Sequence, residues 1–340
     1  MSVLAFIARR LALALLVIVG VITITFTVSN VVPNDPAQLY AGARARPEQL
    51  EAVREHLRLE DPLPRQFIRY IGNVLRGDLG ESFKTRRAIS QDLRTFFPAT
   101  MELVLLATLL ALTIGIPVGV VSASQRGRML DSIARVVTIA GVSIPSFWLA
   151  ILLQLLFFSA LGWLPLSGRL SREIMLGQPI DPVTGFYLID AAVTANWAAW
   201  RDALAHLVLP VVVLATYPVS LVTRMTRAST IEVLGEPYIR TARAAGLPPH
   251  RVLFGRALKN ALLPVLTVLG LTFAYSITGA VLVEVIFAWP GVGKYVTDAI
   301  IATDFPVILA VTLIVTVIYV LINLVVDLLQ AAVDPRIELR

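Results

Sequence analysis

The chain contains no cysteine, and only 15% of its 340 residues are charged. The absence of cysteine excludes disulfides, thiol chemistry and cysteine-based zinc sites. An average soluble domain has about 25% charged residues, so a soluble protein of this size would lack the polar surface to cover its core. Histidine is also scarce: His56, His206 and His250 are far apart and match no zinc-binding spacing. We expect His206 to lie at a membrane interface rather than to bind a metal ion.

The chain instead contains long runs of apolar residues. Hydrophobic residues make up 57% of the chain, and its mean hydropathy is +0.78. A helix needs about 20 apolar residues to cross the hydrocarbon core of a bilayer, and in lipid its backbone polar groups must be paired internally. Six runs meet this length and are predicted to be transmembrane helices: 11–33, 103–124, 136–168, 203–223, 261–283 and 305–326.

Two of these runs are unusual. The first follows Arg9 and Arg10, as the apolar part of a secretory signal peptide would. It is longer than the usual length of roughly 7–15 residues, and no small-residue cleavage site follows it closely. We interpret it as a first span that is retained. The third run is too long for one straight span, and Pro145, which has no backbone N–H, is predicted to start or kink the helix there.

Lys and Arg are concentrated in alternate loops, which predicts the orientation in the membrane. The loop between spans four and five is especially basic; it holds Arg224, Arg227, Arg240, Arg243, Arg251, Arg256 and Lys259. The short loop between spans five and six has only Lys294. Both termini are therefore expected in the cytoplasm. Because the basic residues lie between apolar runs rather than on a soluble module, the lipid bilayer is an expected partner and nucleic acid is not.

Two of the outer loops are long. In the first, apolar residues recur at helical spacing over 47–59 and 66–75, which predicts two short amphipathic helices. These helices would form either a packed cap over the spans or part of a platform for a partner protein outside the membrane. The second loop, 169–201, is dominated by turn residues and indicates no role.

Several short motifs occur in a consistent order. They are Gly-Asp-Leu-Gly-Glu-Ser-Phe at 77–83, Ser-Ile-Pro-Ser-Phe-Trp at 143–148, Arg-Thr-Ala at 240–242 with glycine at 246, Trp-Pro-Gly-Val-Gly-Lys at 289–294, Asp-Phe-Pro-Val at 304–307 and Asp-Pro-Arg at 334–336. Together they make the chain similar to the permeases of ATP-binding cassette (ABC) importers, in the dipeptide, oligopeptide and nickel branch. The broad family has Glu-Ala-Ala in place of Arg-Thr-Ala and a shorter gap from the glycine to Leu-Pro. This departure argues against a sugar-type permease.

The resemblance implies that the loop around Gly246 docks onto a partner ATPase. The residues that match this loop or flank the match are Arg240, Thr241, Ala242, Arg243, Ala245, Gly246 and Leu247, with Leu263 and Pro264 at the loop end, where the fifth span starts. Two short helices are expected, over about 231–245 and 251–262, and Gly246 is expected to stop the first one with a positive φ. The arginines alone would be explained equally by the cytoplasmic bias and by contact with anionic headgroups.

The only Gly-Lys pair does not form an ATP site. Gly293 and Lys294 resemble part of a phosphate loop, but Ala288 occupies the position of its first glycine and Tyr295 follows the lysine. ATP and Mg are therefore expected to bind partner subunits, and the chain is expected to need no cofactor of its own.

Small and charged residues in the spans have separate expected roles. Gly115 and Gly119, four residues apart in the second span, are expected to allow close helix packing. Glu102, Glu284 and Asp327 are expected at span ends, which leaves the span centres without charge.

The expected architecture is an all-α membrane protein of six transmembrane helices. Its parts are a first helix (1–33), an extracytoplasmic helical loop (34–99) and a five-helix permease core (100–340) with the coupling loop 231–264. The expected function is that of a permease subunit, not an enzyme, in an ATP-driven importer of dipeptides or oligopeptides in the bacterial inner membrane. By resemblance, its partners are a second homologous permease, two ATPase subunits and an extracytoplasmic substrate-binding protein.

Three alternatives stay open at this point. The first is an importer of nickel or another small solute, in the same branch. The second is a secondary transporter, which would need ionisable groups within the spans. The third is a membrane-embedded enzyme, which would need a nucleophile with its base, or a metal cluster.

Overall fold

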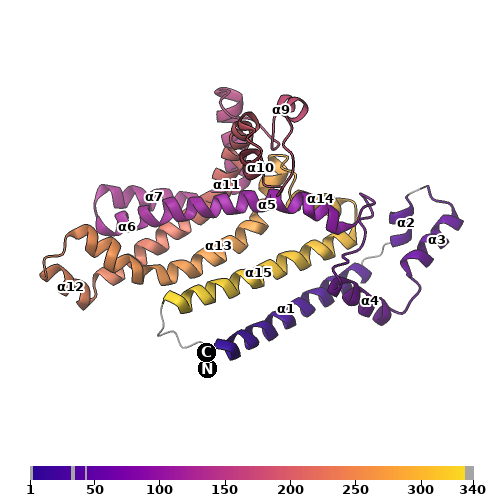
Figure 1. The fold of residues 1–340 in the computed structure, drawn as a ribbon, viewed down its shortest axis with the longest axis horizontal. Coiled ribbons are helices and arrows are strands. Elements are labelled where there is room, and N and C mark those ends of the chain that lie inside the picture. Colours follow the sequence, from indigo (N-terminus) through magenta and orange to yellow (C-terminus); the bar gives the residue numbers. More distant parts are fainter. Residues whose placement is uncertain (1–2, 32–34, 43, 334–340) are drawn as a thin grey trace.

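The computed structural model describes residues 3–31, 35–42 and 44–333, and most of this part is helical (Figure 1). An isolated bridge between Glu81 and Ala88 is the only β-type pairing among these residues, which confirms the all-α prediction. The helices are α1 (Val3–Val31), α2 (Pro36–Ala41), α3 (Pro47–Leu57), α4 (Leu63–Leu75), α5 (Ile89–Leu110), α6 (Ile116–Ser124), α7 (Met129–Ser143), α8 (Ser146–Leu153), α9 (Arg172–Gly177), α10 (Tyr187–Val193), α11 (Trp197–Leu234), α12 (Pro237–Ala244), α13 (Leu258–Ile286), α14 (Val292–Ile301) and α15 (Phe305–Val333), with π-helical segments η1 (Ala111–Gly115), η2 (Gln154–Ala160) and η3 (Arg251–Ala257).

Five helical stretches in the described residues are long and apolar enough to cross a membrane, or up to six if a bent pair counts as one span. They cover Ala8–Val28, Ile89–Ser124, Trp197–Leu234, Arg251–Ile286 and Phe305–Gln330. The second begins at Ile89 rather than at the predicted residue 103, and it runs through the expected domain boundary between residues 99 and 100. Hydropathy marks only the lipid-embedded part of a helix, whereas the hydrogen-bonded helix continues into the loops.

The third apolar run is broken at Pro145, as predicted. The helices on either side, Met129–Ser143 and Ser146–Ala160, are bent by 104° relative to each other. Ile144 has an extended conformation (φ −76°, ψ 123°), which is what a following proline favours. The bend is far larger than a kink, so this run does not form one straight helix.

α11 lies at the centre of the bundle. It packs against α5, α6, α7 and α13, and it is the most buried of the candidate spans. Small residues bring α6 close to it: a Cβ added to Gly119 would lie 2.6 Å from the Cβ of Thr226. A Cβ at Gly115 would lie 2.9 Å from the nearest methyl carbon of Val222. The prediction that these glycines permit close helix packing is confirmed.

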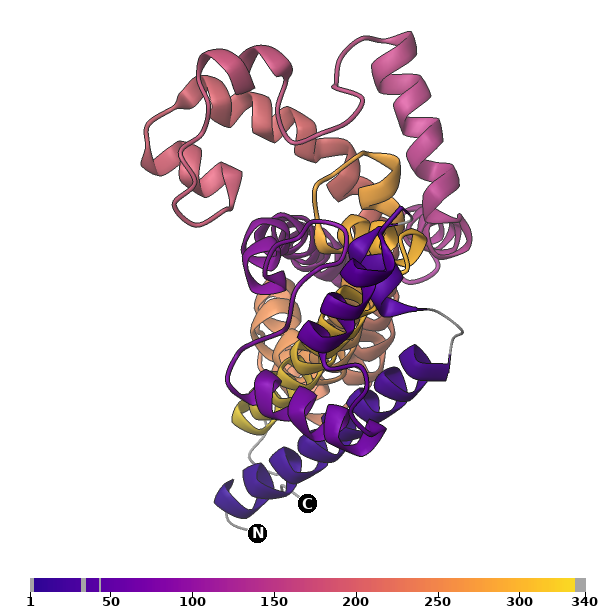
Figure 2. The ribbon, with the colours of Figure 1, turned by 90° about the vertical axis from the view of Figure 1, so that its right-hand side faces the viewer.

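The helical segments between the spans gather at two ends of the bundle. α12 and the turn between α6 and α7 lie at one end, together with the start of α1 and the end of α15, while α2, α3, α4 and α14 lie at the other (Figure 1). The α8 segment and the α9–α10 segment stand on the side of the bundle opposite α1, as both views show (Figure 2).

The two long loops fold into short helices. α3 and α4 occupy the two predicted segments of the first loop, and α2 precedes them, with Asp35 accepting a hydrogen bond from the Ala37 N–H at 3.0 Å. In the second loop, the buried carboxylate of Asp190 accepts hydrogen bonds from the N–H groups of Val183, Thr184 and Gly185. Burial alone would raise the pKa of Asp190. These bonds and one from the Thr184 hydroxyl outweigh burial, so the pKa of Asp190 lies below its usual value.

Candidate coupling site

α12 is a short helix with well-defined ends. Pro237 occupies its first turn, where a missing N–H costs nothing. At its other end Gly246 has φ +77°, so the predicted positive φ is confirmed. The N–H of Gly246 bonds to the carbonyl of Arg243, and the N–H of Leu247 bonds to that of Ala242. These two bonds form a Schellman motif, which stops the helix.

The helix bounds differ from the expected ones on both sides of this turn. Residues 231–234 belong to the end of α11, and α12 begins only at Pro237, because the chain leaves the helical conformation at Glu236 (ψ 146°). After the turn, η3 runs directly into α13. Leu263 and Pro264 therefore lie inside a continuous helix, and the second short helix expected over 251–262 is not separate from α13. Membrane helices tolerate an internal proline when the freed backbone groups find other partners.

The proposed coupling residues divide into two sets. Arg240, Thr241, Arg243, Ala245 and Gly246 are exposed. Ala242 and Leu247 instead pack inward, in a small cluster with the buried side chains of Ile239, Val252 and Ala257. The turn therefore presents two arginines, a hydroxyl and bare backbone to the surroundings, and it uses its apolar side chains to hold its own shape.

Several cations around the α12 turn have no ion-pair partner within the described part of the chain. Among them are the exposed residues Arg240, Arg243, Arg251, Arg256 and Lys259. Arg240 donates only to the carbonyl of Gly235, at 3.3 Å. An uncompensated basic surface of this kind suits an acidic partner surface.

Arg227, from the same basic loop, has a different role. It donates two hydrogen bonds, of 2.6 and 3.0 Å, to the buried carboxylate of Asp131 at the start of α7. Asp131 also accepts from the Ser122 hydroxyl at 2.7 Å and the Gly127 N–H at 2.9 Å. This ion pair fixes the turn between α6 and α7 to α11, beside the coupling end. The charge distribution alone did not separate Arg227 from its exposed neighbours.

At the other end of the bundle, the 77–83 and 304–307 motifs meet. The Ser82 hydroxyl donates to Asp304 at 2.6 Å, and the Lys84 N–H donates to the same oxygen at 3.0 Å. Nearby, the hydroxyls of Thr85 and Tyr295 both donate to Asp92, at 2.6 and 2.9 Å. Burial and the neighbouring Asp92 raise the pKa of Tyr295, so this phenol stays protonated.

The Trp-Pro-Gly-Val-Gly-Lys motif at 289–294 packs around the carboxylate of Glu284. The buried carboxylate accepts hydrogen bonds from the Thr100 hydroxyl at 2.5 Å and from the Lys294 N–H at 2.9 Å. A Cβ at Gly291 would lie 2.3 Å from the carboxyl carbon, so only glycine fits there. The Lys294 ammonium pairs with Asp298 at 2.9 Å.

A buried ion pair joins the second outer loop to α5. Arg169 donates to Glu102 at 2.6 Å, with both side chains at most 5% exposed. The guanidinium also donates to the Gly185 carbonyl at 2.9 Å and lies 3.5 Å from the centre of the Tyr187 ring. Glu102 thus lies inside α5, directly before the apolar run that starts at residue 103. From the sequence, Arg169 could be identified only as a charged residue in a loop. Its position in the sequence gives no indication that it pairs with Glu102.

The remaining expected residues have structural surroundings. His206 is buried, and its Nδ1 lies 2.8 Å from the Asp202 carbonyl. No group of three or more His, Cys, Asp or Glu suited to a metal ion occurs in the part of the chain that the structure describes. Asp327 pairs with Arg10 of α1 at 2.9 Å. The Asp-Pro-Arg motif at 334–336 lies outside the described residues.

Comparison with known proteins identifies the family. Residues 115–339 match "Binding-protein-dependent transport system inner membrane component", and residues 3–104 match "Binding-prot-dependent transport system membrane comp, N-term". The chain is 45% identical to the Di/tripeptide transport system permease protein DppB of Pseudomonas aeruginosa, over 98% of this chain and 99% of that protein. It is 47% identical to the Probable D,D-dipeptide transport system permease protein DdpB of Escherichia coli, over 95% of this chain and 94% of that protein.

A more distant relative and a solved structure extend the comparison. The chain is 36% identical to the Oligopeptide transport system permease protein AppB of Bacillus subtilis, over 98% of this chain and 99% of that protein. Its fold is similar to that of a chain in inward-facing structures of the MetNI methionine ABC transporter, with a TM-score of 0.50 and 17% identity over 71% of this chain and 96% of that chain. The chain therefore belongs to the binding-protein-dependent transport system inner membrane components, which are the multi-pass permeases of ABC importers.

Proposed function

We propose that the chain is a permease subunit of an importer for dipeptides or oligopeptides. The observation that carries this proposal is the similarity, over nearly the whole chain, to three relatives named as peptide transport permeases. A secondary transporter and a membrane-embedded enzyme are excluded by the family. The buried carboxylates of Glu102 and Glu284 are paired or hydrogen-bonded to other segments, so both contribute to packing between segments.

The exposed part of the α12 turn is the proposed contact with an ATPase subunit. Arg240, Thr241, Arg243, Ala245 and Gly246 would face the partner, while Ala242 and Leu247 keep the turn in shape from within. Leu263 and Pro264 would act indirectly, since they lie in the helix that continues from the turn. The uncompensated cations beside the turn support an acidic or polar partner surface.

The proposed orientation has both termini and α12 in the cytoplasm of a bacterial cell, with the chain in the inner membrane. The distribution of Lys and Arg supports it. The grouping of α12, the start of α1 and the end of α15 at one end of the bundle is consistent with it (Figure 1). α2, α3, α4 and α14 would then face the extracytoplasmic side.

The family implies ATPase and substrate-binding partners in general. The specific assembly proposed here is a second homologous permease, two ATPase subunits that bind ATP and Mg, and one extracytoplasmic binding protein. Closure of the ATPase pair would move α12 and shift the spans between inward-facing and outward-facing arrangements. Such a shift requires that the partners bind the two arrangements with different affinity. This chain contributes no catalytic residue and no cofactor site to the cycle.

Transport by the assembled system in proteoliposomes tests the substrate class. We expect ATP-dependent uptake of a labelled dipeptide when the binding protein is present, and none when ATP or the binding protein is omitted. Uptake of labelled nickel ions under the same conditions, without peptide uptake, would replace the peptide assignment by the metal-ion one. The purified chain alone is expected neither to bind nor to hydrolyse ATP.

A further inference from the structure

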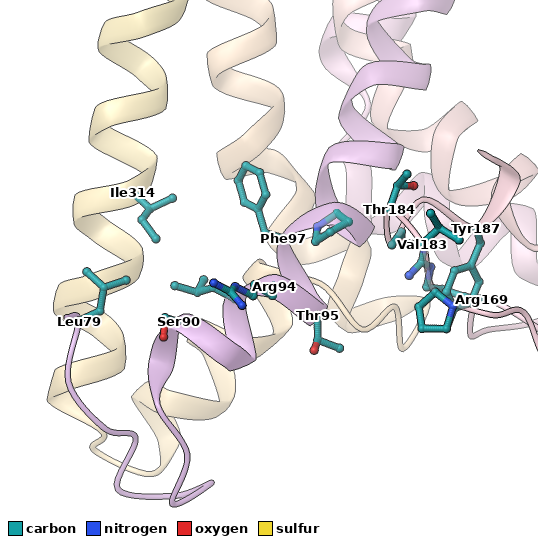
Figure 3. Close-up of a pocket in the computed structure, with 14 residues that line it drawn as sticks. Leu79, Ser90, Arg94, Thr95, Phe97, Arg169, Val183, Thr184, Tyr187 and Ile314 are labelled. Atoms are coloured by element: carbon teal, nitrogen blue, oxygen red, sulfur yellow. Dashed lines mark hydrogen bonds between the residues drawn. The ribbon is translucent and has the colours of Figure 1, made fainter. Parts of the chain in front are cut away.

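A large cavity lies beside the start of α5, at the opposite end of the bundle from α12. Its volume is about 850 Å³, within the range of ordinary ligand pockets. Figure 3 shows Arg94 between a wall formed by Leu79 and Ile314 and a second wall formed by Thr184 and Tyr187. The cavity is thus lined by residues from the loop before α5, the first turns of α5, the second outer loop and α15.

The cavity carries one positive charge that lacks a counter-charge. Arg94 is exposed and forms no ion pair within the described part of the chain. The second arginine at the wall, Arg169, is compensated by Glu102, and its buried Nε lacks a hydrogen-bond acceptor. The residues that line the cavity include hydroxyls, among them Ser90 and Thr95, but no Asp or Glu. The lining therefore suits an anion.

The rest of the lining is apolar and reaches toward the membrane. Leu79, Leu93 and Phe97 line the cavity beside Arg94, and Ile314 adds a side chain from within the sixth apolar run. The α5 residues of the cavity precede the second apolar run at 103–124, so the cavity lies where polar loops meet the lipid-embedded helices. A ligand with an anionic head and an apolar tail matches this division.

We propose that the cavity binds an anionic phospholipid, with its phosphate at Arg94 and an acyl chain along Leu93, Phe97 and Ile314. Basic pockets between membrane helices bind anionic lipid headgroups, and the apolar lining adds contact area for an acyl chain. A free peptide fits less well, because its ammonium group would meet no carboxylate in the lining. The assignment to the outer leaflet rests on the orientation proposed above, whereas the binding itself does not.

Thermal unfolding of the full-length chain in a neutral detergent tests this. Four additives are compared: phosphatidylglycerol, phosphatidylcholine with the same acyl chains, inorganic phosphate, and the dipeptide alanyl-alanine. We expect phosphatidylglycerol to raise the unfolding midpoint and the other three to have little effect. Arg94→Gln should weaken the apparent affinity for phosphatidylglycerol roughly tenfold, the size expected for loss of one charge-assisted contact, and Arg94→Lys should restore most of it.

Arg87→Gln is the matched control, because Arg87 is exposed on the segment that precedes α5 and does not line the cavity. It should leave the affinity for phosphatidylglycerol unchanged, and native mass spectrometry should find the lipid retained by this variant but not by Arg94→Gln. Equal protection by phosphatidylcholine, by phosphate alone or by the dipeptide would overturn the proposal. Equal loss of affinity for phosphatidylglycerol in Arg94→Gln and Arg87→Gln would also overturn it. Failure of peptide transport in proteoliposomes would leave these binding results unaffected, so the two proposals fail separately.

Discussion

Ser82 donates a hydrogen bond of 2.6 Å to the carboxylate of Asp304, although the two residues are 222 positions apart in the chain. Both side chains are buried. Ser82→Ala leaves Asp304 with one donor fewer, and we expect it to lower the free energy of unfolding by about 1–3 kcal/mol. Thermal unfolding in detergent measures this. Thr113→Ala is the control, since that hydroxyl is exposed and bonds within its own helix; equal effects of the two changes would contradict the expectation.

Gly246→Val should uncouple ATP hydrolysis from the permease without preventing membrane insertion. A β-branched residue at φ +77° is strained by on the order of 1–3 kcal/mol, and this strain would distort the Schellman turn but not the spans. The measurement is the stimulation of ATPase activity by loaded binding protein in the assembled system. Gly246→Asn is the control, because asparagine tolerates the left-handed region, and it should keep most of the stimulation. Full stimulation with valine would show that coupling does not depend on the shape of this turn.

Replacing Arg240 and Arg243 together with Glu should reduce the amount of ATPase subunit that co-purifies with the permease. Each exposed pair contributes only about 0–1 kcal/mol, so the double charge reversal is needed for a clear effect. The same reversal at Arg76 and Arg87, exposed residues after α4 and before α5, should leave co-purification unchanged. If both double variants retain the ATPase equally, the α12 arginines do not contribute to docking.

Single cysteines test the orientation, because the chain has no cysteine of its own. Ala245→Cys beside the α12 turn and Glu48→Cys in α3 replace exposed residues with negative φ. We expect an impermeant maleimide to label residue 48, but not residue 245, when the outer face of the cytoplasmic membrane is accessible. Labelling of residue 245 should require permeabilised membranes. The reverse pattern would invert the proposed topology.

Glu102→Ala should destabilise the chain more than any surface change, because it leaves the buried Arg169 guanidinium without its carboxylate. Removing one partner of a buried ion pair costs about 3–5 kcal/mol. Replacing both Glu102 and Arg169 with Met removes the unpaired buried guanidinium. We therefore expect the double variant to unfold at a higher temperature than Glu102→Ala. Glu173→Ala, at an exposed position in α9, should have little effect. A double variant no more stable than Glu102→Ala would mean that the pair is not the source of the loss.

The sequence predicts the membrane helices and the break at Pro145 because hydropathy and proline geometry are local properties. The Gly246 turn is predicted for the same reason: helix, glycine and two prolines lie within a few residues of one another. Helix ends are predicted less well. α5 extends to Ile89 and α13 passes through Pro264, since hydrogen bonding and packing, rather than hydropathy, decide where a helix stops.

The polar contacts between distant segments could not be predicted in the same way. Arg169 and Glu102 are separated by 67 positions, and Arg227 and Asp131 by 96. Nothing in the spacing of these charges distinguishes a buried partner from a solvated one. Ala242 and Leu247 illustrate the same difficulty within the coupling site, because their inward direction depends on the packing of Val252 and Ala257 after the turn.

The continuity of η3 and α13 has a mechanical consequence. The helical stretch Arg251–Ile286 spans 36 residues, or about 54 Å at 1.5 Å per residue. One end is tied to α12 by the 2.6 Å hydrogen bond between Asn260 and Tyr238, and Glu284 near the other end is held by Thr100 and the Gly291 turn. In the proposed orientation, a displacement imposed on α12 would therefore act on one continuous helical stretch that reaches toward the opposite end of the bundle. The two ends of the permease would then rearrange together rather than independently.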